Sequence, residues 1–458
     1  VTERERADVV VGGAGIAGLS AAWELRDRDV RVLEATNRIG GRLMSARRDP
    51  YWLNFGGHVI GGPETETGRL LQATGVESVE LPGVLSGLVM NGRLIAGGRV
   101  ETYPFRVPLA LRDRLGLIRV GVRLRLAVAD YGRVSRLRPG ESEAERRARV
   151  LAYRDDATFA EFLGRTSRDV DEMFRATIRR SSGEPEEVSA GYGIGYFQLV
   201  WDRSKGLSRN IIGGSSTLPS AIARELGDRV VTGSTVDRVT RTDDRVRVEF
   251  VRDGVVQTIT ARAVVVAAPA YAARRMIADL PGDVAAALDR ISYGPYVVGS
   301  FLTSETRAMS YDNVYAAATP KASFNMLFNL ANALRRGGRR DRGGSLMVYA
   351  AANLARDLWD RSDAEVERRF LDDLYERFPD LRGNVREAVI RRWELGVPHP
   401  RPGRHLLQPA LEQPLGNVFL AGDYLGTTYI ETSIETGAAA ARAARRTLDA
   451  SVSPGPGK

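Results

Sequence analysis

A glycine-rich turn near the start of the chain has the residue types and spacing that hold a dinucleotide. Gly13, Gly15 and Gly18 form the pattern Gly-x-Gly-x-x-Gly. In this pattern the first glycine permits a sharp turn, the second lets the backbone approach a diphosphate, and the third lets a helix pack closely on a strand. The diphosphate lies on the N–H groups that open the helix, which here belong to Ile16 and Ala17.

The flanking elements and a carboxylate agree with this chemistry. A β-branched run at 7–12 predicts a buried strand, 17–26 has helical apolar spacing, and 30–34 predicts a second strand. Together they form a βαβ unit of about 30 residues. Glu34 closes the second strand 21 residues after Gly13, where its carboxylate can accept hydrogen bonds from both ribose hydroxyls. This predicts dinucleotide binding but does not separate NAD from FAD.

The residues that follow favour FAD. Residues 34–42 read Glu-Ala-Thr-Asn-Arg-Ile-Gly-Gly-Arg. This stretch resembles the FAD-binding segment of the flavin amine oxidase superfamily, which includes monoamine and amino-acid oxidases, protoporphyrinogen oxidases and phytoene-type desaturases. The resemblance implies that the Arg-x-Gly-Gly-Arg part wraps the FAD pyrophosphate and ribityl chain, because paired glycines offer main-chain donors and guanidinium groups neutralise an anion. The cofactor-binding residues implied in this stretch are Glu34, Ala35, Arg38, Gly40, Gly41 and Arg42.

The C-terminal part of the chain carries a second segment of this kind. Residues 417–423 read Asn-Val-Phe-Leu-Ala-Gly-Asp and resemble the second FAD motif of the superfamily, in which Asp423, after Gly422, would bind the ribityl hydroxyls. The helix that follows, with Ser433 and Ile434 near its start, would aim its N-terminus at the flavin N1/O2 edge and stabilise negative charge there. Ile-Glu-Thr occurs twice, at 430–432 and 434–436, and either copy could match the Met-Glu-Gly of the family.

Two more segments fit the resemblance. Residues 54–60 resemble the stretch that passes the flavin N5 edge, where Gly56 and Gly57 would let the backbone come close. His58 would then meet the substrate or a flavin carbonyl, or it is an ordinary structural histidine. Val236 matches a position at which the family contacts FAD through its backbone. The chain has no cysteine for a thioether, and none of its three histidines stands in a tethering context, so FAD is expected to be bound non-covalently.

Candidates for the substrate pocket are few. Besides His58, the resemblance suggests Tyr429 as a wall of the aromatic substrate cage and Trp393 as a neighbour of the isoalloxazine ring, although both residue types also serve as plain packing residues. Many amine-oxidising members carry a lysine that holds a water at flavin N5. The matching position here is Val298, and Lys321 lies too far along the chain, so this arrangement is expected to be missing. That departure favours a dehydrogenase over a standard amine oxidase.

Composition limits the other classes of function. The chain has 458 residues, 43% hydrophobic and 27% charged, which suffices for a large core and for two or three domains. The absence of cysteine excludes a disulfide scaffold, an iron–sulfur cluster and thiolate-bound zinc, and no metal site is expected. The net charge of +9 reflects arginines spread along the whole chain, so a nucleic-acid partner is not expected.

The middle of the chain raises the question of a membrane surface. Residues 109–137 alternate Leu, Val and Ile with arginine at helical intervals, and 141–163 predict another arginine-rich helix. The first segment fits a basic amphipathic helix at a lipid surface or, as we favour here, a solvent-facing helix on a core. No uncharged apolar run approaches the roughly 20 residues of a spanning helix, so a soluble, cytoplasmic chain is expected.

The expected fold is α/β: a Rossmann-like FAD-binding domain of the glutathione-reductase type, with a βαβ unit and a parallel sheet, interleaved with an α+β substrate-binding domain. The FAD-binding domain would comprise 1–62, 205–290 and 391–458, and the substrate-binding domain 63–204 and 291–390. A helix is predicted over 363–378, an alanine-rich one over 438–448, and a disordered tail over 451–458.

The predicted function is that of an FAD-dependent oxidoreductase that dehydrogenates a C–N or C–C bond of a small or medium-sized substrate, as in specialised metabolism, by hydride transfer to flavin N5. The partners would be this substrate and O₂ or another electron acceptor, and the oligomeric state is open. One alternative is an amine oxidase that uses O₂. Others are a non-redox isomerase of the UDP-galactopyranose mutase type, whose relatives usually carry Asn where Arg42 stands, and a flavin-binding protein without activity.

Overall fold

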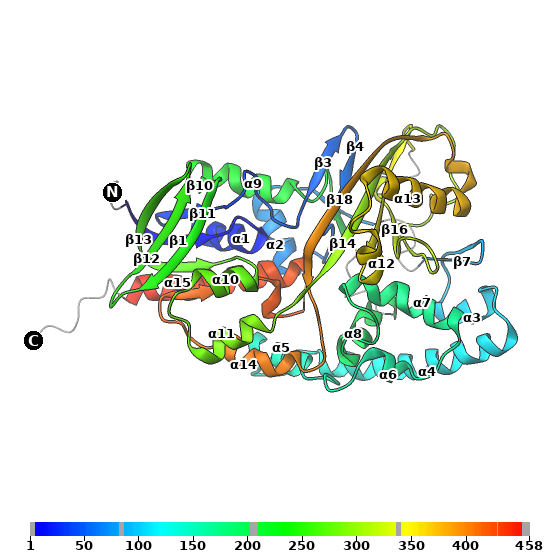
Figure 1. The fold of residues 1–458 in the computed structure, drawn as a ribbon, viewed down its shortest axis with the longest axis horizontal. Helices are drawn as coiled ribbons and strands as arrows, with labels where there is room; N and C mark the ends of the chain where they lie inside the picture. Colours follow the sequence, from blue (N-terminus) through cyan, green and yellow to red (C-terminus); the bar gives the residue numbers. More distant parts are fainter. Residues whose placement is uncertain (1–4, 82–86, 202–208, 336–339, 428, 451–458) are drawn as a thin grey trace, which may run out of the picture.

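The computed structural model describes residues 5–81, 87–201, 209–335, 340–427 and 429–450. It contains two large sheets, one at each end of the long axis of the molecule (Figure 1). The predicted tail at 451–458 lies outside the described residues. Within the described part, no helix is long and apolar enough to cross a membrane.

The first sheet is built from both ends and the middle of the chain. Its strand order is β10-β2-β1-β13-β12-β11, with β19 paired to β13. Strands β10, β2, β1, β13 and β19 are parallel, and β11 and β12 add antiparallel edges. The strand bounds are β1 Glu5–Gly12, β2 Val30–Leu33, β10 Val230–Val231, β11 Ser234–Arg241, β12 Val246–Arg252, β13 Val255–Val266 and β19 Val418–Leu420.

Helices cover both faces of this sheet because its central strands are apolar on both sides. Val9 and Val11 of β1 pack against one set of helices, while Val10 faces the other. The first set comprises α1 (Ile16–Glu24), α9 (Thr217–Leu226), α2 (Glu66–Thr74) and α15 (Ile430–Ala450). The second comprises α10 (Ala270–Met276), α11 (Gly282–Asp289) and α14 (Gln408–Leu411). The predicted α/β class with a Rossmann-like FAD-type domain is therefore confirmed.

The second sheet has the order β18-β14-β17-β16-β15-β7-β8. Its strands are β7 Gly87–Met90, β8 Arg93–Ile95, β14 Tyr293–Thr303, β15 Ala316–Ala318, β16 Met326–Asn329, β17 Gly344–Ala351 and β18 Val385–Pro398. One face packs on α12 (Asn353–Leu358) and α13 (Asp363–Arg377). The other packs on α3 (Tyr103–Arg106), α4 (Leu111–Val134), α7 (Arg168–Ile178) and α8 (Ala190–Trp201). There are also two small sheets. One pairs β3 (Ser45–Arg48) with β4 (Tyr51–Asn54), and the other has the order β5 (Val59–Ile60), β9 (Arg209–Ile211), β6 (Ser78–Glu80).

Several predicted elements differ from the structure. The helix predicted over 141–163 is two helices, α5 (Glu143–Leu151) and α6 (Phe159–Leu163), because Ser142 and Thr158 each form a capping box that starts a separate helix. The alanine-rich helix predicted from 438 begins earlier, at Ile430. Strand β18 runs across the boundary predicted at 390/391, and the domain boundaries stay a prediction.

Candidate active site

The glycine turn between β1 and α1 has the shape that a diphosphate needs. A Cβ atom added to Gly18 would lie 1.9 Å from the carbonyl oxygen of Gly13, so the helix can reach this depth only with glycine there. Gly13 has a φ of 108°, which favours glycine. A Cβ on Gly15, in contrast, would meet nothing within 4 Å. The backbone at Gly15 therefore faces open space beside the N-terminus of α1, as a cofactor cradle requires.

The ribose carboxylate predicted at Glu34 borders this turn. Its Oε2 atom accepts a hydrogen bond from the backbone N–H of Ala14 at 2.8 Å, and its Oε1 accepts from Thr36. Val236 lies beside the end of β1, with its side chain 3.8 Å from the position of a Cβ on Gly12. Glu34, Ala35 and Val236 thus border the same edge of the turn, since the N–H of Ser234 also bonds the Glu34 carbonyl.

The Arg-Ile-Gly-Gly-Arg stretch folds back over the turn. The N–H of Gly40 donates to the carbonyl of Ala14, and Gly15 and Gly40 form a β-bridge. A Cβ on Gly41 would lie 3.2 Å from the Cα of Gly15. Arg38 donates to the carbonyl of Gly41 at 2.7 Å, and burial lowers its pKa. Both glycines have positive φ, and the backbone contact explains why side chains are absent here.

A partly buried ion pair joins the two predicted FAD motifs. The guanidinium group of Arg42 donates to both carboxylate oxygens of Asp423, at 2.7 and 2.9 Å, and to the carbonyl of Gly396 at 2.8 Å. Burial would lower the pKa of Arg42, but Asp423 outweighs it and raises the pKa above its ordinary value. The oxygens predicted to meet ribityl hydroxyls therefore also hold Arg42, and Gly422 sets their position with a φ of 151°.

The segment at 54–58 is held rigidly against this pair. A Cβ on Gly56 would lie 2.0 Å from the carbonyl oxygen of Arg42. The indole N–H of Trp393, on β18, donates to the carbonyl of Phe55 at 2.6 Å. The Gly56 carbonyl accepts from Asn54 at 2.8 Å and lies 3.0 Å from His58 Nδ1. Trp393 therefore positions this segment, and its place beside the isoalloxazine ring stays a prediction.

His58 is buried in an apolar environment. Its ring packs edge-on against Phe328 at 4.7 Å between centroids, and its Nε2 atom has no hydrogen-bond partner among the described residues. Burial lowers the pKa of His58 to about 4, so the imidazole is neutral near pH 7. It can act there as a neutral polar group but not as a cation.

The start of α15 settles which Ile-Glu-Thr copy stands at the helix N-terminus. The helix begins at Ile430, so the copy at 430–432 is terminal, whereas Ile434 lies inside and its side chain is buried in the core against α1. Ser433 already donates its N–H to the carbonyl of Tyr429. A Cβ on Gly57 would lie 3.1 Å from Ile430, which brings this helix start next to the 54–58 segment.

A cluster of tyrosines stands at this helix start. The ring centroid of Tyr196 lies 6.3 Å from that of Tyr429 and 6.0 Å from that of Tyr192. Tyr192 and Tyr196 both belong to α8. Tyr296 of β14 and Tyr349 of β17 form an edge-on pair at 5.5 Å. Burial raises the pKa of Tyr196, Tyr296, Tyr349 and Tyr429, so these phenols stay neutral. We call Tyr192, Tyr196, Tyr296, Tyr349 and Tyr429 the tyrosine cluster.

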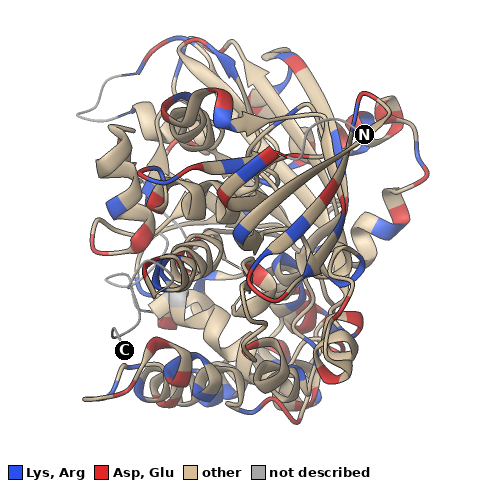
Figure 2. Cartoon of the chain, turned by 90° about the vertical axis from the view of Figure 1, so that its left-hand side faces the viewer, with Lys and Arg blue, Asp and Glu red and all other residues tan. Residues whose placement is uncertain are grey.

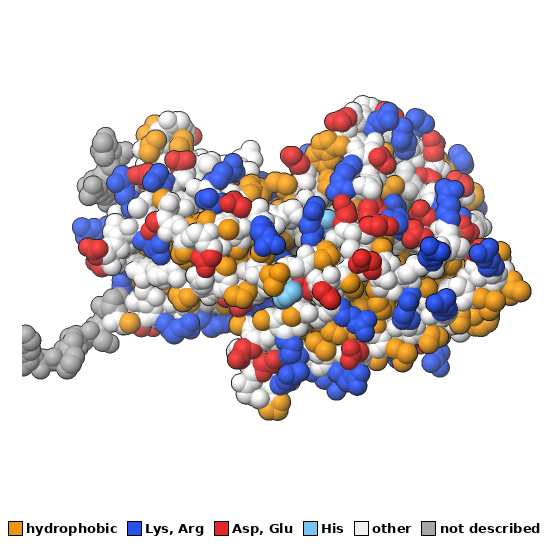
Figure 3. Space-filling view, turned by 60° about the horizontal axis from the view of Figure 1, so that its bottom comes forward, with side chains coloured by type: hydrophobic (Ala, Val, Ile, Leu, Met, Phe, Trp, Pro, Cys, Tyr) orange, Lys and Arg blue, Asp and Glu red, His pale blue; other side chains and the backbone are white. Residues whose placement is uncertain are grey.

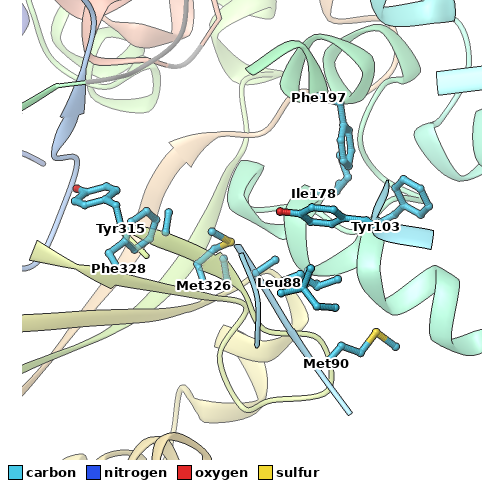
Figure 4. Close-up of a cluster of buried hydrophobic side chains, with 14 of the residues drawn as sticks. Leu88, Met90, Tyr103, Ile178, Phe197, Tyr315, Met326 and Phe328 are labelled. Atoms are coloured by element: carbon cyan, nitrogen blue, oxygen red, sulfur yellow. The ribbon is translucent and has the colours of Figure 1, made fainter. Parts of the chain in front are cut away.

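Arg180 connects the tyrosine cluster to a cavity. Its Cζ lies 5.0 Å from the ring centroid of Tyr196, and it interacts with the hydroxyl of Tyr349. Arg180 also lines a mostly apolar cavity of about 370 Å³ between α3, α4, α7, α8 and the second sheet. Figure 4 shows Leu88, Tyr103, Phe197 and Met326, which line this cavity, pointing toward one another.

Sequence reasoning missed most residues of the tyrosine cluster and of the cavity beside it. Tyr192 and Tyr196 are one helical turn apart, which was a detectable signal, but Arg180 and Tyr349 stand in no recognisable motif. Val298, the position of the family lysine, is a buried core residue beside Tyr349. Lys321 pairs with Asp169 at 2.8 Å, and the other two lysines lie outside the described residues. In the part of the chain that the structure describes, no group of three or more His, Asp or Glu side chains could hold a metal ion.

Comparison with known proteins agrees with this geometry. A family model described as flavin-containing amine oxidoreductase matches residues 16–445. The chain belongs to this family. It is therefore an FAD-dependent oxidoreductase, as its motifs predicted, and the glycine turn, Glu34 and the Arg42 stretch present a cradle that fits FAD.

Individual relatives in this family are distant. The flavin-containing amine oxidase B of Sus scrofa is 30% identical over 258 residues, which cover 53% of this chain and 47% of that protein. The flavin-containing amine oxidase of Oncorhynchus mykiss is 27% identical over 289 residues, 59% of this chain and 51% of that protein. The matches thus span about half the length of these curated relatives.

Solved structures share the whole fold. Cyclohexylamine oxidase from Brevibacterium oxydans IH-35A superposes with a TM-score of 0.76 at 22% identity, over 97% of this chain and 99% of that one. A putrescine oxidase bound to putrescine has a TM-score of 0.75 at 19% identity, over 96% of this chain and 99% of that one. At such identities these likenesses establish the fold alone.

Proposed function

We propose that this flavoprotein dehydrogenates a C–N bond of a small or medium-sized amine. The tyrosine cluster at the start of α15 carries this proposal, because electron-rich ring faces attract an amine nitrogen and orient it. Ile430, which follows Tyr429, lies beside Gly57 of the 54–58 segment, the stretch that the family resemblance assigns to the reactive edge of the flavin. Family membership supports the amine class of substrate.

Bound FAD supplies a two-electron acceptor for the hydride of the carbon next to nitrogen. The chain would hold it through the glycine turn, Glu34 and the Arg42–Asp423 pair, and without a covalent bond, since no cysteine is present. The amine loses one C–H hydrogen as hydride and one N–H hydrogen as a proton, which leaves an imine that water hydrolyses.

The chain's own residues orient the substrate and limit water. Trp393 and His58 fix the 54–58 backbone, and the ring of Tyr429, which packs beside Tyr196, would flank the nitrogen. His58 is neutral and buried, so it adds no charge beside this segment. The N–H proton would pass to water, because Val298, the position at which many relatives carry a lysine, offers no polar group.

A C–C dehydrogenase is the second candidate. The cavity beside the cluster is lined mainly by Leu88, Phe174, Phe197, Met326 and similar apolar side chains, which suits a long hydrocarbon substrate. An amine would use only the end of this space next to Arg180.

Anaerobic mixing tests the proposal. Purified yellow protein is mixed without O₂ with a panel of primary amines, and the flavin band near its visible maximum is followed with ammonia release. We expect bleaching with equimolar ammonia, and Tyr429→Ala should slow it by about 10-fold or more while flavin content stays unchanged. Tyr375→Ala, at a partly exposed position of α13, is the matched control.

Other outcomes identify the alternatives. Bleaching by a saturated hydrocarbon substrate without ammonia would establish C–C dehydrogenation. Product formed without bleaching would establish isomerisation. Reoxidation by air with release of hydrogen peroxide would show that O₂ is the electron acceptor.

A further inference from the structure

Arg180 is the charged residue next to the tyrosine cluster in the proposed substrate chamber, by which we mean this cluster and the adjoining cavity. Glu101 and Arg125 also line the cavity. It lies in the short helix η2 (Arg179–Ser181) that follows α7, with its guanidinium 5.0 Å from the Tyr196 ring centroid. The hydroxyl of Tyr296 donates to its carbonyl at 2.5 Å, which fixes the backbone. Arg180 is therefore held in the tyrosine cluster by its own main chain as well as by its side chain.

The charge of Arg180 has no carboxylate partner among the described residues. Its Nε atom is buried without a hydrogen-bond partner. The arginines next to it differ: Arg175 and Arg179 both bind Glu184, at 2.8 and 2.9 Å. Because a guanidinium charge in a poorly hydrated space is unfavourable without an anion beside it, the partly buried Arg180 offers a place for an anion that no described carboxylate fills.

This cation decides which amines the chamber accepts. A simple amine reaches the enzyme as an ammonium ion, which Arg180 repels in a chamber that excludes most water. A diamine would carry two such charges. An amine that also bears an anionic group would be attracted instead, since a guanidinium binds a carboxylate by charge-assisted hydrogen bonds.

We propose that Arg180 binds the carboxylate of the substrate, and that the substrate is an amino acid whose apolar side chain occupies the cavity of about 370 Å³. Arg180 lines that cavity together with Phe174, Phe197 and Met326, so the carboxylate site and the apolar space adjoin. The proposal rests on the C–N dehydrogenation proposed above and names the substrate class of the same site.

Paired substrates test the proposal. The holoenzyme is mixed anaerobically with phenylalanine and leucine, and with phenethylamine and isopentylamine, which lack only the carboxylate. We expect the second-order rate constant for flavin reduction to be about 10- to 100-fold higher with the amino acids than with the matching amines. Arg180→Met should remove this preference, and Arg180→Lys should restore part of it. Arg165→Met, an exposed arginine outside the chamber, is the control.

A binding measurement separates this inference from the reaction. Benzoate and benzamide have the same shape and differ in charge, and each is titrated while the flavin absorption spectrum is followed. Benzoate should bind the wild type more tightly than benzamide, and Arg180→Met should lose that difference. If amines reduce the flavin and amino acids do not, or if the variant keeps its benzoate affinity, the Arg180 assignment is overturned and the amine function stands. If benzoate binding follows Arg180 but no amine or amino acid reduces the flavin, the amine function is overturned and the anion site stands.

A different observation carries a second inference, about the outer face of α3 and α4. Five large apolar side chains project there into solvent: Phe105 (66% exposed), Leu111 (70%), Leu115 (60%), Val122 (57%) and Leu126 (68%). On α4 their spacing is four, seven and four residues, so they share one side of the helix. Figure 3, which brings this side of the molecule forward, shows orange and blue side chains gathered at the end that carries α3 and α4.

The charges beside this apolar stripe are mainly basic, with Glu101, which pairs with Arg99 and Arg125, as an acidic exception. The exposed charged residues of α4 are arginines, among them Arg112, Arg119, Arg123 and Arg125, whereas Asp113 and Asp130 are partly buried. Elsewhere, on the face shown in Figure 2, acidic and basic side chains alternate. A helix with an outward apolar stripe and flanking cations complements an anionic lipid surface.

The cavity opens on the same side. Phe105, Val122 and Leu126 belong both to the exposed stripe and to the cavity lining. We propose that the outer face of α3 and α4 docks on an anionic lipid bilayer, with the cavity mouth at the lipid surface.

Vesicle sedimentation tests this docking. We expect the holoenzyme to sediment with vesicles of phosphatidylcholine and phosphatidylglycerol and much less with phosphatidylcholine alone. Leu111→Glu combined with Leu115→Glu should abolish binding, and Arg112→Glu with Arg119→Glu should weaken it by about 10-fold or more. Val255→Glu with Val256→Glu, at an exposed hairpin of the first sheet, is the control. Absence of vesicle binding, or a dimer that the leucine substitutions dissociate, would show that another partner or a second copy covers this face.

Discussion

Two glycines of the same turn serve different purposes, and substitution separates them. A Cβ on Gly18 would lie 1.9 Å from the Gly13 oxygen, so Gly18→Ala must displace α1 and should lower the free energy of unfolding by about 1–3 kcal/mol. A Cβ on Gly15 meets nothing within 4 Å, so Gly15→Ala should leave the unfolding of the apoprotein unchanged within about 0.5 kcal/mol. It should instead weaken FAD binding by about 10-fold or more, because the methyl group occupies diphosphate space. Urea unfolding of the apoprotein and fluorescence titration with FAD measure both effects; equal FAD affinity of Gly15→Ala and wild type would refute the cradle.

The carboxyl group of Glu435 should make the stability of the protein depend on pH. It faces a cavity of about 580 Å³ on α15, and burial, with Glu431, raises its pKa to about 7 from an ordinary 4.5. The folded state therefore binds more protons than the unfolded state between these values, and stability falls as the pH rises through this window. Glu435→Gln should be more stable than wild type by about 1 kcal/mol at pH 8, after allowance for its partial exposure, and equal at pH 4. Thermal unfolding at both values checks this, with Glu225→Gln as an exposed control.

Packing between α1 and α15 limits the side chains at their contact. A Cβ on Gly437 would lie 2.1 Å from the carbonyl oxygen of Ala17, a backbone atom that cannot move alone. Gly437→Ala should therefore destabilise the protein by about 1–3 kcal/mol and loosen the start of α15. Gly116→Ala on α4, where nothing lies within 4 Å, should stabilise it by about 0.5–1 kcal/mol. Chemical unfolding compares the two; a neutral Gly437→Ala would mean that the helices can separate freely.

Elements built from local sequence were predictable, and those built from distant contacts were not. The βαβ unit at Gly13 and Glu34 lies within one stretch of chain, so its turn, helix and strands followed from spacing alone. The tyrosine cluster draws Tyr296 from β14, Tyr349 from β17 and Tyr429 from the start of α15, and only tertiary folding brings them together. The start of α15 was placed too late because the alanine run at 438 has the highest helix propensity, while Glu431 ties the true start to the N–H groups of Glu66 and Thr67.

At the scale of the whole molecule, one ion pair ties together parts of the chain that are far apart in sequence. Arg42 binds both oxygens of Asp423 and the carbonyl of Gly396, which lies near the end of the long strand β18 of the second sheet. Arg42→Met would leave Asp423 buried and unpaired, so it should lower the free energy of unfolding by about 3–5 kcal/mol and reduce the flavin retained.

The double variant decides whether the pair acts as a unit. Arg42→Met combined with Asp423→Asn removes both charges, so it should be less destabilised than the sum of the single variants, by about 1–3 kcal/mol. Urea unfolding of the apoproteins gives the three free energies, and a double-mutant cycle extracts the coupling. Additive effects would show that each residue is held by other neighbours. Coupling with loss of FAD in all three variants would show that the pair joins the two FAD motifs and is needed before the cofactor can bind.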